Sequence, residues 1–288
     1  MNKNILFTCY PTLNTEGFES VSATKKTIPG AIVIYSCNKH KETRLKKFVL
    51  SKKNYNGWKV FIIIGNPFLK TDYEIEDNII TIKCEDSYIH LSKKIILGFK
   101  IIFELYNVEE GILRCGDDLV FNETKLEKFT KIPNKSDYLG SIIRYDKVIV
   151  KHYDNFMPDY FNSHPQDLTN PLNGIPYTLE EMQKFNQVPL TNYASGVLIY
   201  FSKKACDILI DHMEIIDWNV FHKSEKYGYP YIIEDITIGF ILNKNNIYPV
   251  SYKIYGDSLA ELENMNDTSI AMHTNEYKEN YRNVQWNS

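Results

Sequence analysis

The stretch Gly111-Ile-Leu-Arg-Cys-Gly-Asp-Asp118 runs from apolar residues directly into two adjacent carboxylates. Short apolar runs that are closed by glycine and charged residues are typical of buried strands, so we expect a strand over Gly111–Cys115. Ligands bind at the carboxyl ends of strands in open α/β sheets. Asp117 and Asp118 therefore offer hard oxygen ligands suited to Mg²⁺ or Mn²⁺ on a diphosphate, with an acidic turn as the alternative interpretation.

Short β-rich runs alternate with helical patterns before this stretch. An apolar stripe in steps of three and four residues from Tyr88 to Tyr106 predicts a long helix, with capping residues at 85–87. The charged segment Lys39–Leu50 also has a helical pattern. This alternation predicts a mixed, mainly parallel sheet flanked by helices. Strands are expected over Ile5–Tyr10, Ala31–Ser36, Val60–Gly65 and Ile79–Ile82.

The second half of the chain contains a long segment with a weaker pattern. Residues 147–189 hold five prolines and many asparagine and aromatic residues, which predicts a loop-rich insertion, and long loops are often functional. A helix is expected to begin near Asn122. Beyond the insertion we expect a strand over Val197–Phe201, a helix capped by Ser202 that ends at Ile216, and a helix from Glu234-Asp235 to about Leu242.

Length and composition limit the class of protein. The 288 residues carry 33 basic and 36 acidic side chains, a net charge of −3 that lacks the basic excess needed to bind nucleic acid. The length allows one large α/β domain or two smaller ones, and either buries a sizeable core. We expect a single domain over 1–288, in two halves over 1–122 and 123–288.

The cysteines and the apolar runs bear on the cellular compartment. The five cysteines are odd in number, widely spaced and never in a CxxC pair, which favours reduced thiols over a disulfide framework or a zinc site. The first apolar run is too short for a signal peptide, and the longest, Ile95–Tyr106, is too short to span a membrane. We therefore expect a cytoplasmic protein without a membrane anchor, in a bacterial or viral (host-cytoplasm) setting.

A second pair of carboxylates, Glu234-Asp235, follows the tyrosine-rich segment Tyr227-Gly-Tyr-Pro-Tyr231. A carboxylate there can accept a proton from a hydroxyl nucleophile, and helix capping is the alternative. The segment Tyr193-Ala-Ser-Gly196 does not match G-x-S-x-G and predicts a tight turn lining a pocket. The basic segment Lys39–Lys53 indicates a solvated helix face or the border of a phosphate site.

Four ordered segments resemble the inverting β-1,3-glycosyltransferase family, which includes the β-1,3-galactosyl- and N-acetylglucosaminyltransferases and fringe. Asp86-Ser-Tyr-Ile-His-Leu-Ser-Lys-Lys94 is similar to the family's DSYxNLTxK, and Arg114-Cys-Gly-Asp-Asp-Leu-Val-Phe-Asn122 to its KxDDDxFxN metal motif. Tyr193-Ala-Ser-Gly196 resembles the start of YCSGxGYxxS, and Glu234-Asp-Ile-Thr-Ile-Gly239 resembles EDVYxG.

The resemblance implies a GT-A (Rossmann-like) fold, with a nucleotide-binding half over 1–122 and an acceptor-binding half over 123–288. It also implies a UDP-sugar donor, Mn²⁺ or Mg²⁺, and transfer of a hexose or N-acetylhexosamine to a glycan acceptor with inversion, forming a β-1,3 linkage. Asp118 matches the last aspartate of the metal motif, and Asp235 matches the catalytic base. His273 in Ala271-Met-His-Thr274 is the candidate for the family's C-terminal metal ligand. The resemblance assigns these residues to donor binding: Tyr10, Asp86, Asp117, Ser195 and Gly196.

One departure from the family pattern concerns the metal motif, because Gly116 replaces its first aspartate. A non-catalytic nucleotide- or glycan-binding module derived from such a transferase is therefore the alternative function. A hydrolase, which places two carboxylates around the bond it cleaves, is a minor third interpretation. The high aromatic content, 14%, is concentrated partly in the insertion and before Asp235, where sugar rings need flat faces to stack on.

Overall fold

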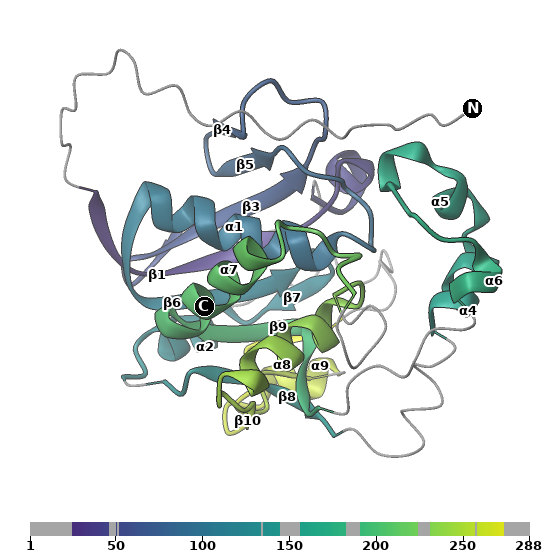
Figure 1. Ribbon diagram of the computed structural model, residues 1–288. Helices are drawn as coiled ribbons and strands as arrows, with labels where there is room; N and C mark the ends of the chain where they lie inside the picture. Colours follow the sequence, from purple (N-terminus) through teal and green to yellow (C-terminus); the bar gives the residue numbers. More distant parts are fainter. Residues whose placement is uncertain are drawn as a thin grey trace, which may run out of the picture.

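The computed structural model describes residues 25–45, 50, 52–133, 135–144, 156–182, 191–223, 231–256 and 258–273. Its larger sheet has the strand order β10-β8-β9-β6-β1-β3-β5-β4 (Figure 1). The short strand β2 pairs with the first residues of β3. The strands are β1 (Lys26–Tyr35), β2 (Asn54–Tyr55), β3 (Trp58–Gly65), β4 (Tyr73–Glu76), β5 (Ile79–Ile82), β6 (Tyr106–Gly116), β8 (Tyr138–Ile143), β9 (Tyr193–Ser202) and β10 (Val250–Ser251).

The middle of this sheet is parallel and is bordered by an antiparallel strand on each side, β4 and β9. Strands β6, β1, β3 and β5 run in the same direction, whereas β9 is antiparallel to both β6 and β8. The predicted mixed α/β sheet is therefore confirmed, with its parallel strands at the centre. Because β1 and β6 pair in parallel with Tyr35 opposite Gly116, the segments that follow them meet at one edge of the sheet.

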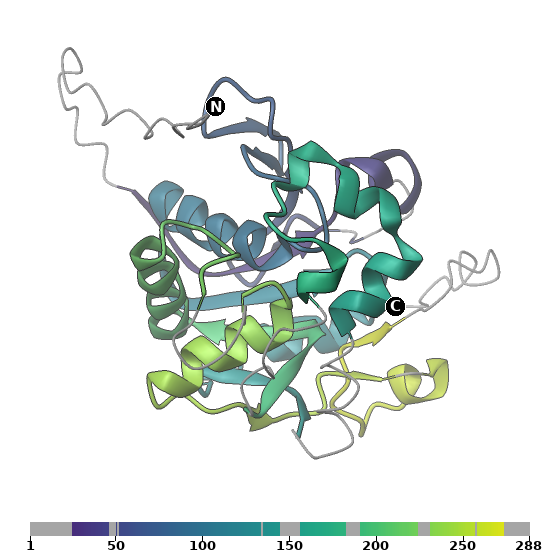
Figure 2. The same ribbon diagram turned by 45° about the vertical axis from the view of Figure 1, so that its right-hand side comes forward.

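Both faces of the sheet are buried, which explains why its central strands are continuous apolar runs. On β1, Val33 and Tyr35 belong to the core under one set of helices, whereas Ile32 and Ile34 belong to the core on the opposite face. Helices from well-separated parts of the chain cover the first face (Figures 1 and 2). They are α1 (Leu91–Leu105), α7 (Lys203–Ile215) and α8 (Glu234–Lys244).

The opposite face carries a smaller sheet with the order β11-β12-β7. It comprises β7 (Leu119–Phe121), β11 (Tyr255–Gly256) and β12 (Ala271–His273), and α2 (Glu123–Thr130) follows β7. Strand β12 is antiparallel to β7, with Leu119 opposite His273. This pairing carries the C-terminal part of the described chain to the end of the central strand β6.

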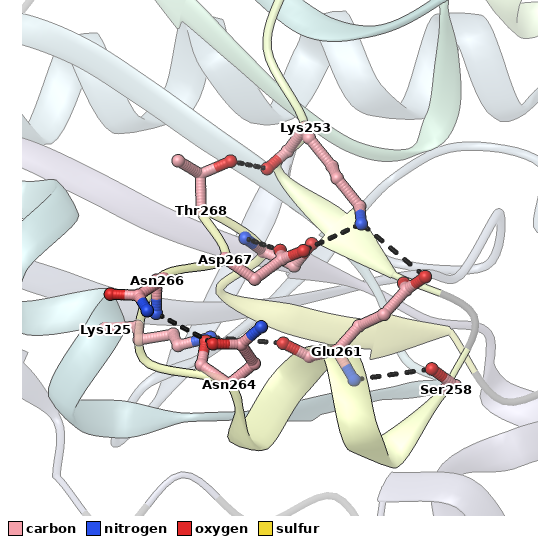
Figure 3. A network of polar contacts seen from close by, with 9 residues as sticks. Lys125, Lys253, Ser258, Glu261, Asn264, Asn266, Asp267 and Thr268 are labelled. Carbon is pink, nitrogen blue, oxygen red and sulfur yellow. Dashed lines mark hydrogen bonds and ion pairs between the residues drawn. The ribbon is translucent and has the colours of Figure 1, made fainter.

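A polar network fixes the segment that leads to β12 (Figure 3). Lys125 Nζ donates to the carbonyl oxygens of Glu261, at 3.3 Å, and Asn264, at 2.7 Å, at the end of α9 (Leu259–Glu263). Lys253 Nζ bridges the Asp267 carboxylate, at 2.8 Å, and the Glu261 side chain, at 3.5 Å. The network therefore ties α9 to α2 and restricts the path of the chain into β12.

The insertion and the loop after β1 form short helices. In the described part of the insertion these are α4 (Phe156–Ser163), α5 (Pro165–Thr169), η3 (Pro171–Asn173) and α6 (Leu179–Met182), which lie together at one side of the molecule (Figure 2). The described part of Lys39–Leu50 forms a 3₁₀ turn, η1 (Asn38–His40), and a π turn, η2 (Lys41–Leu45), in place of the expected helix. Among the described helices, none has the length and apolar character of a membrane span.

Several predicted element boundaries are confirmed and others are wrong. Asn122 caps α2 by accepting from Lys125 N, and Ser202 caps α7 by accepting from Ala205 N. The capping residues expected at 85–87 do not cap α1, which begins at Leu91, and Tyr106 already belongs to β6. The turn expected over 193–196 is part of β9. The expected strand Ile5–Tyr10 lies outside the described residues.

Candidate functional site

Asp117 is held at the carboxyl edge of the sheet by residues that follow β1. Ser36 Oγ donates to Asp117 Oδ2 at 2.6 Å, and Arg44 Nη1 lies 3.2 Å from Asp117 Oδ1. The aspartate is buried, whereas the Arg44 side chain is 37% exposed. A cation and a hydroxyl therefore stand beside the Asp117 carboxylate.

Asp86 organises the backbone of the same edge. Its carboxylate accepts hydrogen bonds from Asn38 N, at 2.6 Å, and Gly65 N, at 3.1 Å. Lys94 Nζ donates to the same carboxylate, at 2.8 Å, and to Ser36 O, at 2.7 Å. These contacts join the ends of β1 and β3 to α1, so Asp86 shapes the edge, and its direct contact with a nucleotide stays a prediction.

Asp118 and His273 lie together across the small sheet. His273 Nε2 is 3.3 Å from Asp118 Oδ2, because the antiparallel pairing of β12 with β7 places His273 opposite Leu119. Burial by itself raises the pKa of Asp118, but the hydrogen bond and charge of His273, with the Arg44 charge, outweigh burial and hold this pKa below its ordinary value. The carboxylate is therefore ionised at neutral pH and can act as a ligand.

The residues present fit a divalent cation on this pair. Two ligand atoms bound at right angles to one octahedral ion lie about 3 Å apart, close to the 3.3 Å between Nε2 and Oδ2. In the described parts of the chain, no cluster of three or more histidine, cysteine, aspartate or glutamate side chains is placed to hold a metal. A divalent ion held here would have these two protein ligands among the described residues, and its other positions would be open to further ligands and water.

Gly116 has a steric role beside this pair. A Cβ atom at position 116 would stand 2.7 Å from Asp118 Oδ1, so any side chain there presses on the Asp118 carboxylate. Gly116, which stands where the metal motif has its first aspartate, thus leaves space for the Asp118 carboxylate.

Tyr255 connects the pair formed by Asp118 and His273 to β9. Its hydroxyl lies 3.0 Å from Ser195 Oγ, and its ring meets the His273 ring edge-on with centroids 6.4 Å apart. The next residue, Gly196, faces α8, because a Cβ atom there would collide with the carboxyl groups of Asp235 and Glu234. Ser195 and Gly196 thus bridge the two halves of the candidate site.

Asp235 lies in the first turn of α8, where the helix dipole favours negative charge. The N-cap residue is Ile233, and no side chain caps the helix, so the alternative of capping by Asp235 is not observed. Glu234 is buried, and burial raises its pKa well above the ordinary value, against the opposing charge of Arg114. The two adjacent carboxyl groups therefore differ in environment, as acid–base pairs in active sites do.

The structure thus brings together Asp118 with His273, and Ser195 and Gly196 with Asp235, while Tyr10 lies outside the described residues. Ser36 and Tyr255 were not predicted as site residues, because neither lies in a motif that indicates a site. Arg44 falls in the basic segment for which a phosphate-site border was one of two interpretations. The described cysteines, Cys37, Cys84, Cys115 and Cys206, form no disulfide with one another.

The mixed α/β sheet flanked by helices, with acidic side chains at its carboxyl edge, is consistent with a GT-A-like glycosyltransferase fold. The family model described as Galactosyltransferase matches residues 65–253, well over half of the chain. The protein belongs to this family of β-1,3-galactosyltransferase and fringe-like enzymes. No curated protein matches the chain. The matched segment contains Asp86, Asp117, Asp118, Ser195, Gly196 and Asp235, and ends before Tyr255 and His273.

Proposed function

We propose that this glycosyltransferase is metal-dependent and inverting, and that it transfers a hexose or N-acetylhexosamine from a UDP-sugar to a glycan acceptor, forming a β-1,3 linkage. The observation that supports the proposal is the line of contacts from Asp118 and His273 through Tyr255 to Ser195, whose neighbour Gly196 faces the Asp235 carboxylate. Asp118 and His273, which can bind a cation, thus stand at one end of the site, and the Asp235 carboxylate stands at the other. Glycosyl transfer with a single base needs a cation for the leaving group and a carboxylate for the acceptor hydroxyl.

The donor end of the site would bind the diphosphate. Asp118 and His273 would hold Mn²⁺ or Mg²⁺, which when bound supplies Lewis-acid stabilisation of the negative charge on the leaving UDP. Arg44, whose Nη1 lies 3.2 Å from Asp117 Oδ1, can neutralise further phosphate charge. Asp117 and Ser36, which are fixed to each other at 2.6 Å, would line the ribose and donor-sugar side.

The acceptor end of the site would activate the attacking hydroxyl. As the acceptor oxygen forms its bond to the anomeric carbon, its proton passes to Asp235, and the bond from that carbon to the UDP oxygen breaks. Attack opposite to the leaving group inverts the anomeric configuration. Asp235 then returns the proton to solvent, so one carboxylate suffices for the cycle.

The test is UDP release with a panel of UDP-sugars and glycan acceptors, with and without Mn²⁺, for the wild-type enzyme and Asp235→Asn. The proposal predicts turnover that needs both metal and acceptor and falls by about 10³-fold in Asp235→Asn, within the range for loss of a general base. Asp211→Asn, at an exposed position of α7, is the matched control and should retain turnover. Full activity of Asp235→Asn would refute the mechanism.

A non-catalytic binding module is the second candidate, and one observation favours it: only two protein ligands face the metal position within the described residues, with Gly116 in place of a third carboxylate. Calorimetry of UDP with and without Mn²⁺ separates the two candidates. Strengthening of UDP binding by Mn²⁺ supports the transferase, whereas binding that ignores Mn²⁺ supports the module. UDP-sugar cleavage without any acceptor would indicate hydrolysis.

A further inference from the structure

Tyr255 lies between the cation-binding end and the base end of the proposed site. Its ring meets the His273 ring edge-on, with centroids 6.4 Å apart, and its hydroxyl lies 3.0 Å from Ser195 Oγ. The residue after Ser195, Gly196, faces the Asp235 carboxylate. The proposed mechanism gives Tyr255 no task, and the segment that matches the family ends before it, at residue 253. No role for Tyr255 therefore follows from the family.

The two side chains that carry these hydroxyls are accessible in parts of the chain that are otherwise buried. Tyr255 is half-buried between the buried residues Ile254 and Gly256, and on β9 the half-buried residues 195–197 have buried neighbours on both sides. Asp235 is half-buried as well, within a run of buried residues. These positions therefore keep the access to solvent that a ligand-binding surface needs.

The location of the two hydroxyls corresponds to the place of the transferred sugar. In a UDP-sugar the anomeric carbon is bonded to a diphosphate oxygen, and the ion on Asp118 and His273 would hold that diphosphate. Attack opposite to the leaving group brings the acceptor oxygen, with Asp235 as its base, to the other side of the same carbon. The sugar ring therefore lies between the ion and Asp235, which is the interval that Tyr255 and Ser195 occupy.

The two hydroxyls have the chemistry to bind a sugar hydroxyl together. Each carries one proton and accepts hydrogen bonds through its oxygen, so the bond between Tyr255 and Ser195 uses one of their two protons. The second proton and the remaining lone pairs complement a sugar hydroxyl, which also donates and accepts. Removing one partner of such a bond leaves the other unsatisfied, and this loss corresponds to about tenfold in binding.

We propose that Tyr255 and Ser195 form a hydroxyl pair that recognises one hydroxyl group of the donor sugar, and that Tyr255 thereby determines donor specificity. The inference rests on the proposed function, because it places the transferred sugar between the ion and the base named there. Tyr255 and His273 come from β11 and β12, which pair in parallel in the small sheet. The C-terminal segment thus contributes to sugar selection as well as to ion binding.

Calorimetry tests the inference without relying on turnover. Two kinds of probe are compared at saturating Mn²⁺: UDP, which lacks the sugar, and a panel of UDP-hexoses and UDP-N-acetylhexosamines. Tyr255→Phe keeps the ring beside His273 and removes only the hydroxyl. It should weaken binding of the UDP-sugar that wild type binds best by about tenfold and leave UDP binding within threefold. Tyr252→Phe, on the same segment with its ring against Phe129, is the matched control and should change neither.

Deoxy forms of the best-bound UDP-sugar identify the hydroxyl that the pair recognises. Wild type should bind one of these analogues about tenfold more weakly than the parent sugar. Tyr255→Phe should bind that analogue and the parent within threefold of each other, because the partner of the missing hydroxyl is already gone. Tyr255→Phe/Ser195→Ala should lose at most a further threefold or so, because two hydroxyls in contact act as a unit and their losses are not additive.

A merely structural role for Tyr255 predicts a different pattern. Equal weakening of UDP and UDP-sugar binding in Tyr255→Phe would overturn the inference, because the tyrosine would then support His273 or the fold. Wild-type affinity for the UDP-sugar, unchanged discrimination of every deoxy analogue, or fully multiplied losses in the double variant would each overturn it too.

The Asp235→Asn assay keeps the two proposals apart. Unchanged turnover of Asp235→Asn refutes the base and leaves the comparison of UDP with UDP-sugar binding standing. Slow turnover of Asp235→Asn together with unaffected UDP-sugar binding by Tyr255→Phe refutes only the hydroxyl pair.

Discussion

Replacing Gly196 with alanine would place a methyl group against the two carboxyl groups of α8. A Cβ atom at this position stands 2.5 Å from Glu234 Oε2 and closer to Asp235 Oδ1, whereas ordinary contact begins near 3.4 Å. The backbone of Gly196 is not in the left-handed region, so alanine itself brings no backbone strain. The expected effect is therefore on the carboxylates and not on the strand.

The size of the effect follows from these distances. The two oxygens must retreat by about 1 Å to restore normal contact, and a misplacement of that size costs about 10²-fold in rate. This factor corresponds to about 2.7 kcal/mol of transition-state stabilisation. The loss should appear in kcat, because Asp118, His273 and Arg44 at the donor end lie outside the contact.

UDP release under saturating donor and acceptor measures the prediction, with calorimetry of UDP to check the donor end. Gly140→Ala is the matched control, because its Cβ would lie 2.7 Å from Ala194 Cβ on the same pair of strands but touches neither carboxylate. We expect Gly140→Ala to lose stability and keep kcat within threefold. A Gly196→Ala enzyme that also keeps kcat within threefold of wild type would refute the reasoning.

Three further predictions concern the metal pair, the C-terminal network and acid stability. His273→Ala should raise the Mn²⁺ concentration for half-maximal turnover by at least about tenfold, while His164→Ala, in the insertion, should not. Lys125→Met should lower the free energy of unfolding in urea by about 1–3 kcal/mol, because two carbonyl oxygens lose their donor, and the half-exposed Lys253→Met should cost under about 1 kcal/mol. Burial lowers the pKa of His90 and of His212 to about 4, so the unfolded chain alone binds protons between about pH 6.5 and 4, and stability falls as the pH drops through this window. His90→Asn should flatten that fall in urea titrations at pH 7 and 5, and an unchanged slope would contradict it.

The central strands were predictable because they are buried on both faces, and their apolar runs show this directly. The runs over 31–36, 60–65 and 79–82 correspond to β1, β3 and β5. The start of α1 was mispredicted for a physical reason. Asp86 looks like a cap in the sequence, but its carboxylate binds the backbone of Asn38 and Gly65, which are remote along the chain.

The candidate site was predictable only as far as local motifs reach. Asp118 and Asp235 were identified by ordered segments, and His273 by the resemblance, while Tyr255 and Ser36 depend on tertiary contacts that no spacing encodes. The segment 193–196 was read as a turn because serine and glycine favour turns. In the structure Gly196 sits within a strand and its missing side chain makes room for two carboxyl groups from another element.

The pairing of β12 with β7 would couple the binding of a ligand at Asp118 and His273 to the formation of that pairing. Any ion or donor that contacts both Asp118 and His273 binds only the state in which β12 is in place, so its binding free energy adds to the stability of that pairing. The donor complex would then protect the β12 amides from hydrogen exchange more than it protects those of β3. The donor substrate would thus stabilise the pairing of β12 with β7.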